Sequence, residues 1–140
     1  MELAQGEVAS IAHSIQLSVA PVFLLSGIGV FLGVLTNRLG RVVDRARAFE
    51  EKFAAASGED AEVLRRRLRV LAKRARLING SITLATISAL LVAIVVALLF
   101  ASAFVRFSLA LPVAVLFVAS MFALVGALVA FLVEVRIATL

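Results

Sequence analysis

Three stretches of the chain contain no Asp, Glu, Lys or Arg, and each is rich in Leu, Val, Ile, Phe and Ala. They are Val8–Asn37, Leu77–Val105 and Phe107–Val133. A bilayer core about 30 Å thick is crossed by a helix of about 20 apolar residues. The pattern therefore predicts an all-α membrane protein with three spanning helices. We place the spans at about residues 14–37, 77–104 and 108–133.

The charged segment between the first two spans carries two apolar seams with heptad spacing. The first seam is Leu39, Val42, Ala46, Phe49 and Phe53, and the second is Leu64, Leu68, Leu71, Ala75 and Ile78. Such seams are typical of helices that pack side by side. Two antiparallel helices turning between Gly58 and Glu59 would place the seams face to face. We therefore predict that residues 38–76 form a helical hairpin that extends the first two spans, rather than a flexible charged loop.

A second apolar pattern lies outside the hairpin seam. Val63, Val70 and Leu77 recur every seven residues. Unless they are scattered surface residues, three apolar side chains in register need a partner. The partner could be the C-terminal tail, another subunit or the membrane surface. Since three helices make a thin bundle, we predict a homo-oligomer.

Composition agrees with the membrane assignment and narrows the chemistry. Hydrophobic residues make up 63% of the 140 positions, against about 45–50% in soluble domains. Three spans leave too little chain for a separate soluble enzyme, so residues 1–140 are predicted to form a single membrane domain. The chain has no cysteine and one histidine, His13. No nucleophile, base and metal ligands are grouped together, so we expect no enzyme activity and no cofactor.

Positive charge is concentrated between the first two spans and sets the expected orientation. Twelve of the fourteen Lys and Arg residues lie between Arg38 and Arg76, together with six acidic residues. The positive-inside rule places such a segment in the cytoplasm. We therefore expect the N-terminus and the turn at Arg106 outside, and the hairpin and C-terminus in the cytoplasm.

Several arginines lie at the cytoplasmic edge of the first span, including Arg38, Arg41 and Arg45. Basic residues there attract anionic lipid headgroups by about 1 kcal/mol each. Positive-inside topology alone would also place them there. Membrane lipids are the expected partners. Nucleic acid is not, because the basic residues alternate with acidic ones and no aromatic stacking surface accompanies them.

Two acidic residues at this edge are candidate assembly contacts. Asp44 is flanked at helical spacing by Arg41 and Arg47 and would be an assembly contact if a second subunit covers it. Glu134 ends the third span at the same expected depth. It is predicted to pair with Arg38 or Arg41.

Small residues mark two candidate packing faces within the spans. Gly29-x-x-x-Gly33 in the first span permits close helix approach. Matching small faces on the third span are provided by Ala123 with Ala127 and by Gly126 with Ala130. Packing within one chain and packing between chains are both open alternatives.

The outer end of the first span is its most polar part. Pro21 is expected to kink or loosen the helix, and His13 and Gln16 precede it. One interpretation is an interfacial helix start. The other is a vestibule in which His13 responds to pH.

Hydroxyl side chains are distributed along the second and third spans. They are Ser81, Thr83, Thr86, Ser88, Ser102 and Ser120. Hydroxyls within a span usually donate to the backbone of their own helix. We expect that arrangement here, rather than a hydroxyl-lined pore.

Four blocks of residues carry a further signal. They are Pro21-Val-Phe-Leu-Leu-Ser-Gly, Thr36-Asn-Arg-Leu-Gly-Arg-Val-Val-Asp-Arg-Ala-Arg, Arg76-Leu-Ile-Asn-Gly-Ser-Ile and Phe131-Leu-Val-Glu-Val. Together they resemble the bacterial membrane family catalogued as domain of unknown function 2721, over roughly His13 to Leu140. The resemblance implies a small protein of the bacterial inner (cytoplasmic) membrane. It implies no activity and no catalytic residue. The polar or special positions that fit the family's pattern are Pro21, Arg38, Arg41, Asp44, Arg45, Asn79 and Glu134.

The function expected from these features is that of a non-enzymatic, self-assembling scaffold or interaction module with a basic cytoplasmic hairpin. The alternative is a homo-oligomeric channel for ions or small solutes, lined by the first span. No small-molecule ligand can be named from the sequence.

Overall fold

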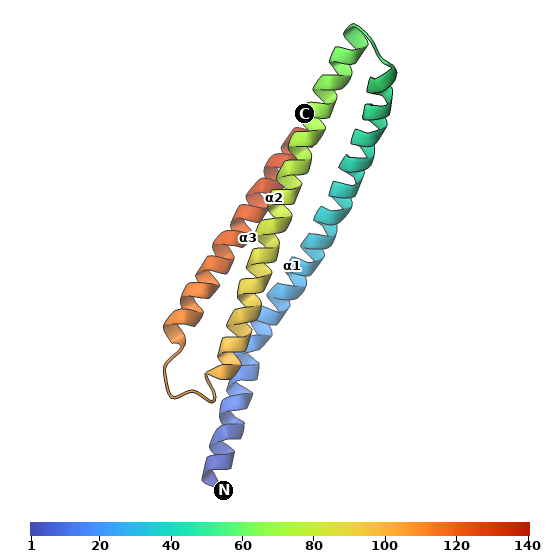
Figure 1. Ribbon diagram of the computed structural model, residues 1–140. Helices are drawn as coiled ribbons and strands as arrows, with labels where there is room; N and C mark the ends of the chain where they lie inside the picture. Colours follow the sequence, from blue (N-terminus) through green and yellow to red (C-terminus); the bar gives the residue numbers. More distant parts are fainter. The chain divides into compact units, whose positions relative to one another are not determined.

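A computed structural model describes residues 1–140 as three α-helices joined by two short connections (Figure 1). The helices are α1 (Glu2–Ala55), α2 (Glu59–Ala101) and α3 (Ala110–Thr139). Each is long and apolar enough to cross a membrane. The prediction of an all-α protein with three helices of spanning length is therefore confirmed.

The connection between α1 and α2 is a tight turn centred on Gly58. This glycine has a φ of +67°, in the left-handed region that a residue without a Cβ adopts at little cost. Its carbonyl accepts the N–H of Glu62 at 3.3 Å. Glu59, Asp60 and Glu62 occupy the first turn of α2, where the helix dipole favours negative charge. Both long helices run without a break from this turn into the apolar stretches.

The chain forms two compact units, and each unit contains parts of all three helices. The first unit comprises Met1–Phe31 and Ala85–Leu124, and the second comprises Leu32–Leu84 and Val125–Leu140.

In the first unit, the buried face of α1 and α2 contains several serines besides aliphatic residues such as Ile28 and Val92. Ser14 and Ser18 of α1 are each 5% exposed, and Ser88 of α2 is fully buried. The Ser14 hydroxyl donates to the carbonyl of Leu99 at 3.1 Å, and the Ser88 hydroxyl donates to the carbonyl of Ser120 at 2.8 Å. The first bond joins α1 to α2, and the second joins α2 to α3.

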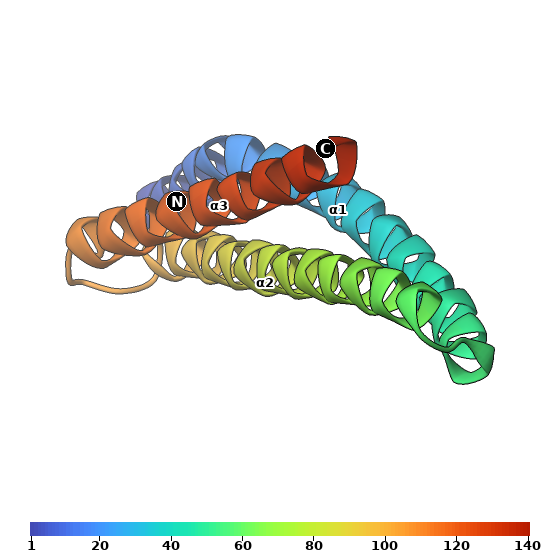
Figure 2. The ribbon, with the colours of Figure 1, turned by 90° about the horizontal axis from the view of Figure 1, so that it is seen from above.

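In the second unit, the last turns of α3 lie against both α1 and α2 (Figure 1 and Figure 2). The Ser81 hydroxyl of α2 donates to the carbonyl of Ala127 of α3 at 2.7 Å. Gly126, which directly precedes Ala127 on α3, lies close to Leu84, which follows Ser81 by three residues on α2. A Cβ built on Gly126 would lie 3.1 Å from Cδ1 of Leu84. Gly126 is therefore the glycine at which α3 approaches α2 closely.

The buried positions recur every seven residues along the helices. On α1 they include Pro21, Ile28, Leu35 and Val42, and on α3 they are Ser120, Ala127 and Glu134. A seven-residue period keeps one face of a helix against its neighbours and is typical of left-handed packing. Pro21 lies on this buried face, and α1 continues through it as a helix.

The expectation that hydroxyls bond within their own helix is correct for some residues and wrong for two. Thr83 donates to the carbonyl of Asn79 in α2. Ser102, which directly follows the last residue of α2, donates to the carbonyl of Leu99. Ser81 and Ser88 instead donate to α3. Both are fully buried, and the hydroxyl of each lies within hydrogen-bond distance of a backbone carbonyl of α3.

The bond from Ser88 to α3 predicts a measurable contribution to stability. Ser88→Ala removes one interhelical hydrogen bond and should lower the free energy of unfolding in detergent by about 0.6 kcal/mol, the average for such bonds between membrane helices. The measurement is equilibrium unfolding of micellar protein with a denaturing detergent. Thr83→Val is the matched control, since its hydroxyl bonds to its own helix. Equal losses in the two variants would contradict the interhelical role.

Candidate functional site

A buried carboxylate on α3 joins all three helices of the second unit. The side chain of Glu134 is 0% exposed. Its Oε2 accepts hydrogen bonds from Nη2 of Arg38 at 2.7 Å and from Nε of the same residue at 3.0 Å. Its Oε1 accepts a hydrogen bond from Nε of Arg74 at 3.0 Å. We call these three residues, from α1, α2 and α3, the ionic clamp.

The electrostatics of the clamp account for its burial. Removing a carboxylate from water costs several kcal/mol, and the cost is offset only when close, well-directed donors satisfy it. Here both oxygens of Glu134 are satisfied by guanidinium groups, which form strong charge-assisted bonds with carboxylates. The two arginine side chains are 29% and 14% exposed. The clamp as a whole carries one net positive charge.

An aromatic ring holds one of the arginines in place. The guanidinium carbon of Arg38 lies 5.4 Å from the ring centroid of Phe131, a distance at which a cation is attracted to the ring face. Phe131 precedes Glu134 by three residues and therefore shares its face of α3. The same helix face thus supplies both a carboxylate and an aromatic surface to Arg38.

The local sequence explains why the clamp forms at one level. Arg38 directly follows the charge-free stretch of α1, and Glu134 directly follows that of α3. Arg74 precedes the charge-free stretch of α2 by three residues. Each charged group therefore lies at the polar end of its apolar segment.

The structure shows which of the two predicted partners bonds to Glu134, and it shows a further partner that was not predicted. Glu134 pairs with Arg38 and not with Arg41. The bond from Arg74 was missed by sequence reasoning. The available signal was its spacing, because Arg74 follows Leu71 by three residues and precedes Ile78 by four, and both are buried.

Other basic residues extend the site along α1. Arg41 and Arg45 are exposed, and together with Arg38, Arg74 and Val42 they line a small pocket. Asp44 is exposed and forms no salt bridge, so the flanking arginines do not pair with it. Its role in assembly stays a prediction.

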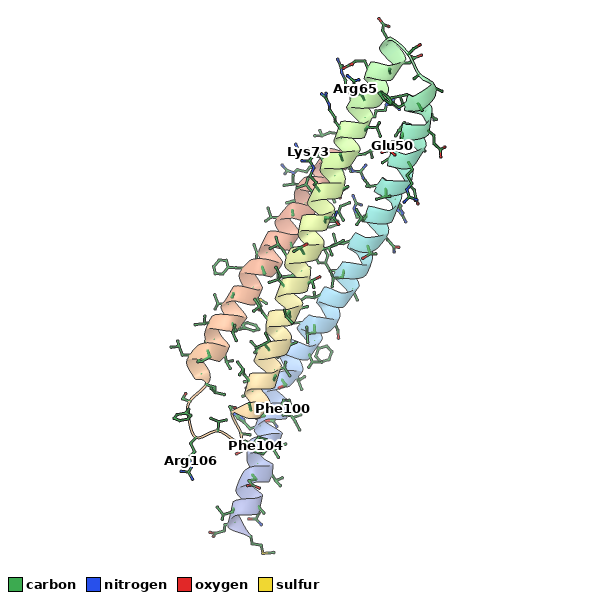
Figure 3. The ribbon with its side chains drawn as sticks, viewed as in Figure 1. Glu50, Arg65, Lys73, Phe100, Phe104 and Arg106 are labelled. Carbon is green, nitrogen blue, oxygen red and sulfur yellow. The ribbon has the colours of Figure 1, made fainter.

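Side chains of α1 and α2 also meet between the clamp and the turn at Gly58. The guanidinium carbon of Arg65 lies 5.9 Å from the ring centroid of Phe53, and that of Arg67 lies 5.6 Å from the ring of Phe49. Glu50 of α1 and Arg65 of α2 line the same groove (Figure 3).

The residues predicted to form packing faces differ in how much the chain itself covers them. Ala127 is fully buried and accepts the bond from Ser81, and Ala123 is half-buried. Gly29 and Gly33 are exposed, and a Cβ built on either would meet nothing within 4 Å. The alternative of intramolecular packing at these two glycines therefore finds no support, whereas packing between chains stays a prediction.

The residues predicted to form a vestibule do not share one environment. His13 and Gln16 are exposed, whereas Pro21 is buried. An apolar groove of the first unit is lined by residues that include Ser18 of α1 and Phe100 of α2, but neither His13 nor Gln16 lines it.

A family model described as a protein of unknown function (DUF2721) matches residues 18–140. The chain belongs to this family. The predicted resemblance is confirmed, and the matched region contains Pro21 and all three residues of the ionic clamp. No curated protein and no solved structure matches the chain.

The ionic clamp predicts a large loss of stability when its carboxylate is neutralised. Glu134→Gln leaves two partly buried guanidinium groups without a counter-charge. Because breaking a buried ion pair costs about 3–5 kcal/mol and the arginines here are partly hydrated, we expect about 2–4 kcal/mol. Equilibrium unfolding in detergent measures the loss.

Glu62→Gln is the control for this substitution. Glu62 is about half-exposed, and its two ion pairs within α2 are 3.9 Å long, so its loss should cost no more than about 0.5 kcal/mol. A Glu134 variant no less stable than the Glu62 variant would show that the clamp does not hold the three helices together.

Proposed function

We propose that the protein is a non-enzymatic, self-assembling structural module of the bacterial inner membrane. In this proposal three spans anchor it, and the parts of α1 and α2 nearest the turn at Gly58 project into the cytoplasm as an antiparallel hairpin. The hairpin is the surface offered to other copies or to other components of the membrane. The proposal rests above all on the ionic clamp.

The clamp supports this proposal because it uses its only carboxylate for joining helices. Both oxygens of Glu134 are bonded to arginines from the two other helices. The clamp also separates two chemical environments. On one side each helix continues as a charge-free apolar segment, and on the other side α1 and α2 are rich in charge. We therefore place the clamp at the cytoplasmic edge of the bilayer.

Beyond the clamp, α1 and α2 have the length and contacts of a projecting hairpin. From Arg38 to the end of α1 at Ala55, a rise of 1.5 Å per residue gives about 25 Å. The contacts of Arg65 with Phe53 and of Arg67 with Phe49 support an antiparallel pairing of the two arms. The net positive charge of this segment supports its cytoplasmic location.

Self-assembly is supported by apolar side chains that the chain itself does not cover. Val63 and Val70 lie seven residues apart on the charged arm of α2, and they are 50% and 47% exposed. On a hairpin in the cytoplasm these side chains would face water. Their spacing suits a second helix packed along them, since heptad positions form a continuous stripe. The exposed Gly29 and Gly33 offer a further surface for contact between chains within the membrane.

A channel lined by α1 is the alternative function. The exposed Ser26, Gly29 and Gly33 of α1 would also suit the axis of an oligomer. However, the Ser26 hydroxyl donates to the carbonyl of Val22 in its own helix at 3.3 Å. A hydroxyl used in this way favours helix packing over a polar pore lining.

The proposed topology predicts opposite labelling of the two connections between helices. Because the chain has no cysteine, single cysteines introduced by Ser57→Cys and Ser108→Cys can be labelled without background. An impermeant maleimide added to intact spheroplasts should modify the Ser108 variant only. The Ser57 variant should react only after the membrane is opened. Labelling of the Ser57 variant in intact spheroplasts would refute the cytoplasmic hairpin.

The proposed assembly predicts that polar substitutions at the apolar stripe dissociate the protein. The double variant Val63→Gln, Val70→Gln should shift the particle mass in detergent toward the monomer, while the wild type forms a defined oligomer. Ala48→Gln, Ala55→Gln is the matched control, since these two alanines are exposed on α1 with the same spacing. Light scattering corrected for bound detergent measures the mass.

A wild-type particle that is strictly monomeric would refute self-assembly, and equal dissociation of both double variants would remove the apolar stripe as its cause. The same purified protein in liposomes should conduct no ions. Reproducible single-channel currents would favour the alternative of a channel.

A further inference from the structure

Four arginines surround one small pocket beside the ionic clamp. Arg38, Arg41 and Arg45 come from one side of α1, and Arg74 comes from α2. The spacing of three and four residues places the three α1 side chains on a single helix face. The pocket has a volume of about 150 Å³, and Val42 forms its apolar floor.

The positive charge of this pocket exceeds what the chain neutralises. Glu134 is the one carboxylate bonded to these arginines, and both of its oxygens are taken by Arg38 and Arg74. Arg41 and Arg45 form no salt bridge. Asp44 lies between them in sequence but does not line the pocket. Guanidinium groups that line one small pocket repel one another, and an anion bound among them lowers this repulsion.

We infer that the pocket binds the phosphate group of an anionic phospholipid from the cytoplasmic leaflet. Guanidinium groups bind phosphate in a planar, two-pronged geometry that an ammonium group does not offer, and every basic residue of the pocket is an arginine. This inference rests on the proposed topology, which places the clamp at the cytoplasmic edge of the bilayer.

The position of the pocket matches the depth of lipid phosphates. Arg38 directly follows the charge-free stretch. Arg45, seven residues further on, lies about 10 Å from it along the axis. The interfacial layer beside the hydrocarbon core is about 5–8 Å thick on each side. The arginines therefore extend across the headgroup layer.

The size and surroundings of the pocket favour a lipid over a soluble phosphate compound. Sites for small organic ligands are usually about 300–1,000 Å³, which is larger than the 150 Å³ found here. A lipid needs to insert only its phosphate. On the same face of α1, four residues before Arg38 toward the membrane, lies Val34, which is apolar and 45% exposed. An acyl chain can leave the pocket along this surface.

Binding of short-chain lipids in a neutral detergent tests this inference. Dodecyl maltoside micelles carry no charge, so general attraction to an anionic surface does not contribute. Dihexanoyl phosphatidylglycerol should bind saturably, one molecule per chain, by native mass spectrometry and calorimetry. Dihexanoyl phosphatidylcholine and inorganic phosphate should bind at least about tenfold more weakly.

The double variant Arg41→Gln, Arg45→Gln removes half of the pocket's positive charge without altering the clamp. We expect at least about a tenfold loss of affinity for the phosphatidylglycerol. Lys73→Gln, Arg76→Gln is the matched control. It removes the same charge near the membrane edge of α2 from residues that do not line the pocket. Its affinity should change by less than about threefold.

Three outcomes of these binding measurements would overturn the inference. No saturable binding, or equal losses in the two double variants, would show that the pocket is not a site for lipid phosphate. Binding of inorganic phosphate as strong as that of the lipid would assign the pocket to a soluble ligand instead. The particle mass and the cysteine labelling of the same preparations test the proposed function separately, so an oligomer with the expected topology that binds no lipid refutes this inference alone.

Discussion

The pairing of one buried carboxylate with two arginines is the constraint on which the second unit depends. Glu134 has no exposure to water and is bonded through both oxygens to Arg38 and Arg74. A carboxylate buried without these donors would carry a large desolvation cost. The clamp therefore fixes α1, α2 and α3 at a single level in this unit, which uniform hydrophobic side chains would not do.

Packing within the apolar segments has to work under a different constraint. Lipid tails are as apolar as Leu or Val, so burying such side chains between helices gives little net driving force. Beside buried aliphatic residues such as Leu35 and Ile78, the chain therefore also places small residues where helices meet. Ser81 and Ser88 donate hydrogen bonds across to α3, and Gly126 lets α3 approach Leu84. Close approach and hydrogen bonding in these segments are combined with ionic pairing at their polar end.

The predictions from sequence were strongest where one property dominates a long segment. The absence of charge over each apolar stretch was sufficient to predict three helices of spanning length, and the turn after the first helix was correctly placed at Gly58. The predictions from sequence were weaker for individual contacts between side chains. Gly29 and Gly33 have a spacing common in packed membrane helices, yet both lie open in the chain, while Ser81 and Arg74 were not recognised as interhelical donors. Spacing identifies a helix face but not the neighbour that covers it.

The sequence by itself determined the number of helices, their apolar and charged portions and the family, because hydropathy and charge act residue by residue along a segment. Only the tertiary structure decided that Glu134 bonds both Arg38 and Arg74, and that these arginines share a pocket with Arg41 and Arg45. Those pairings depend on the rotation of each helix about its own axis. That rotation is set by how all three helices pack together, which no single helix encodes alone.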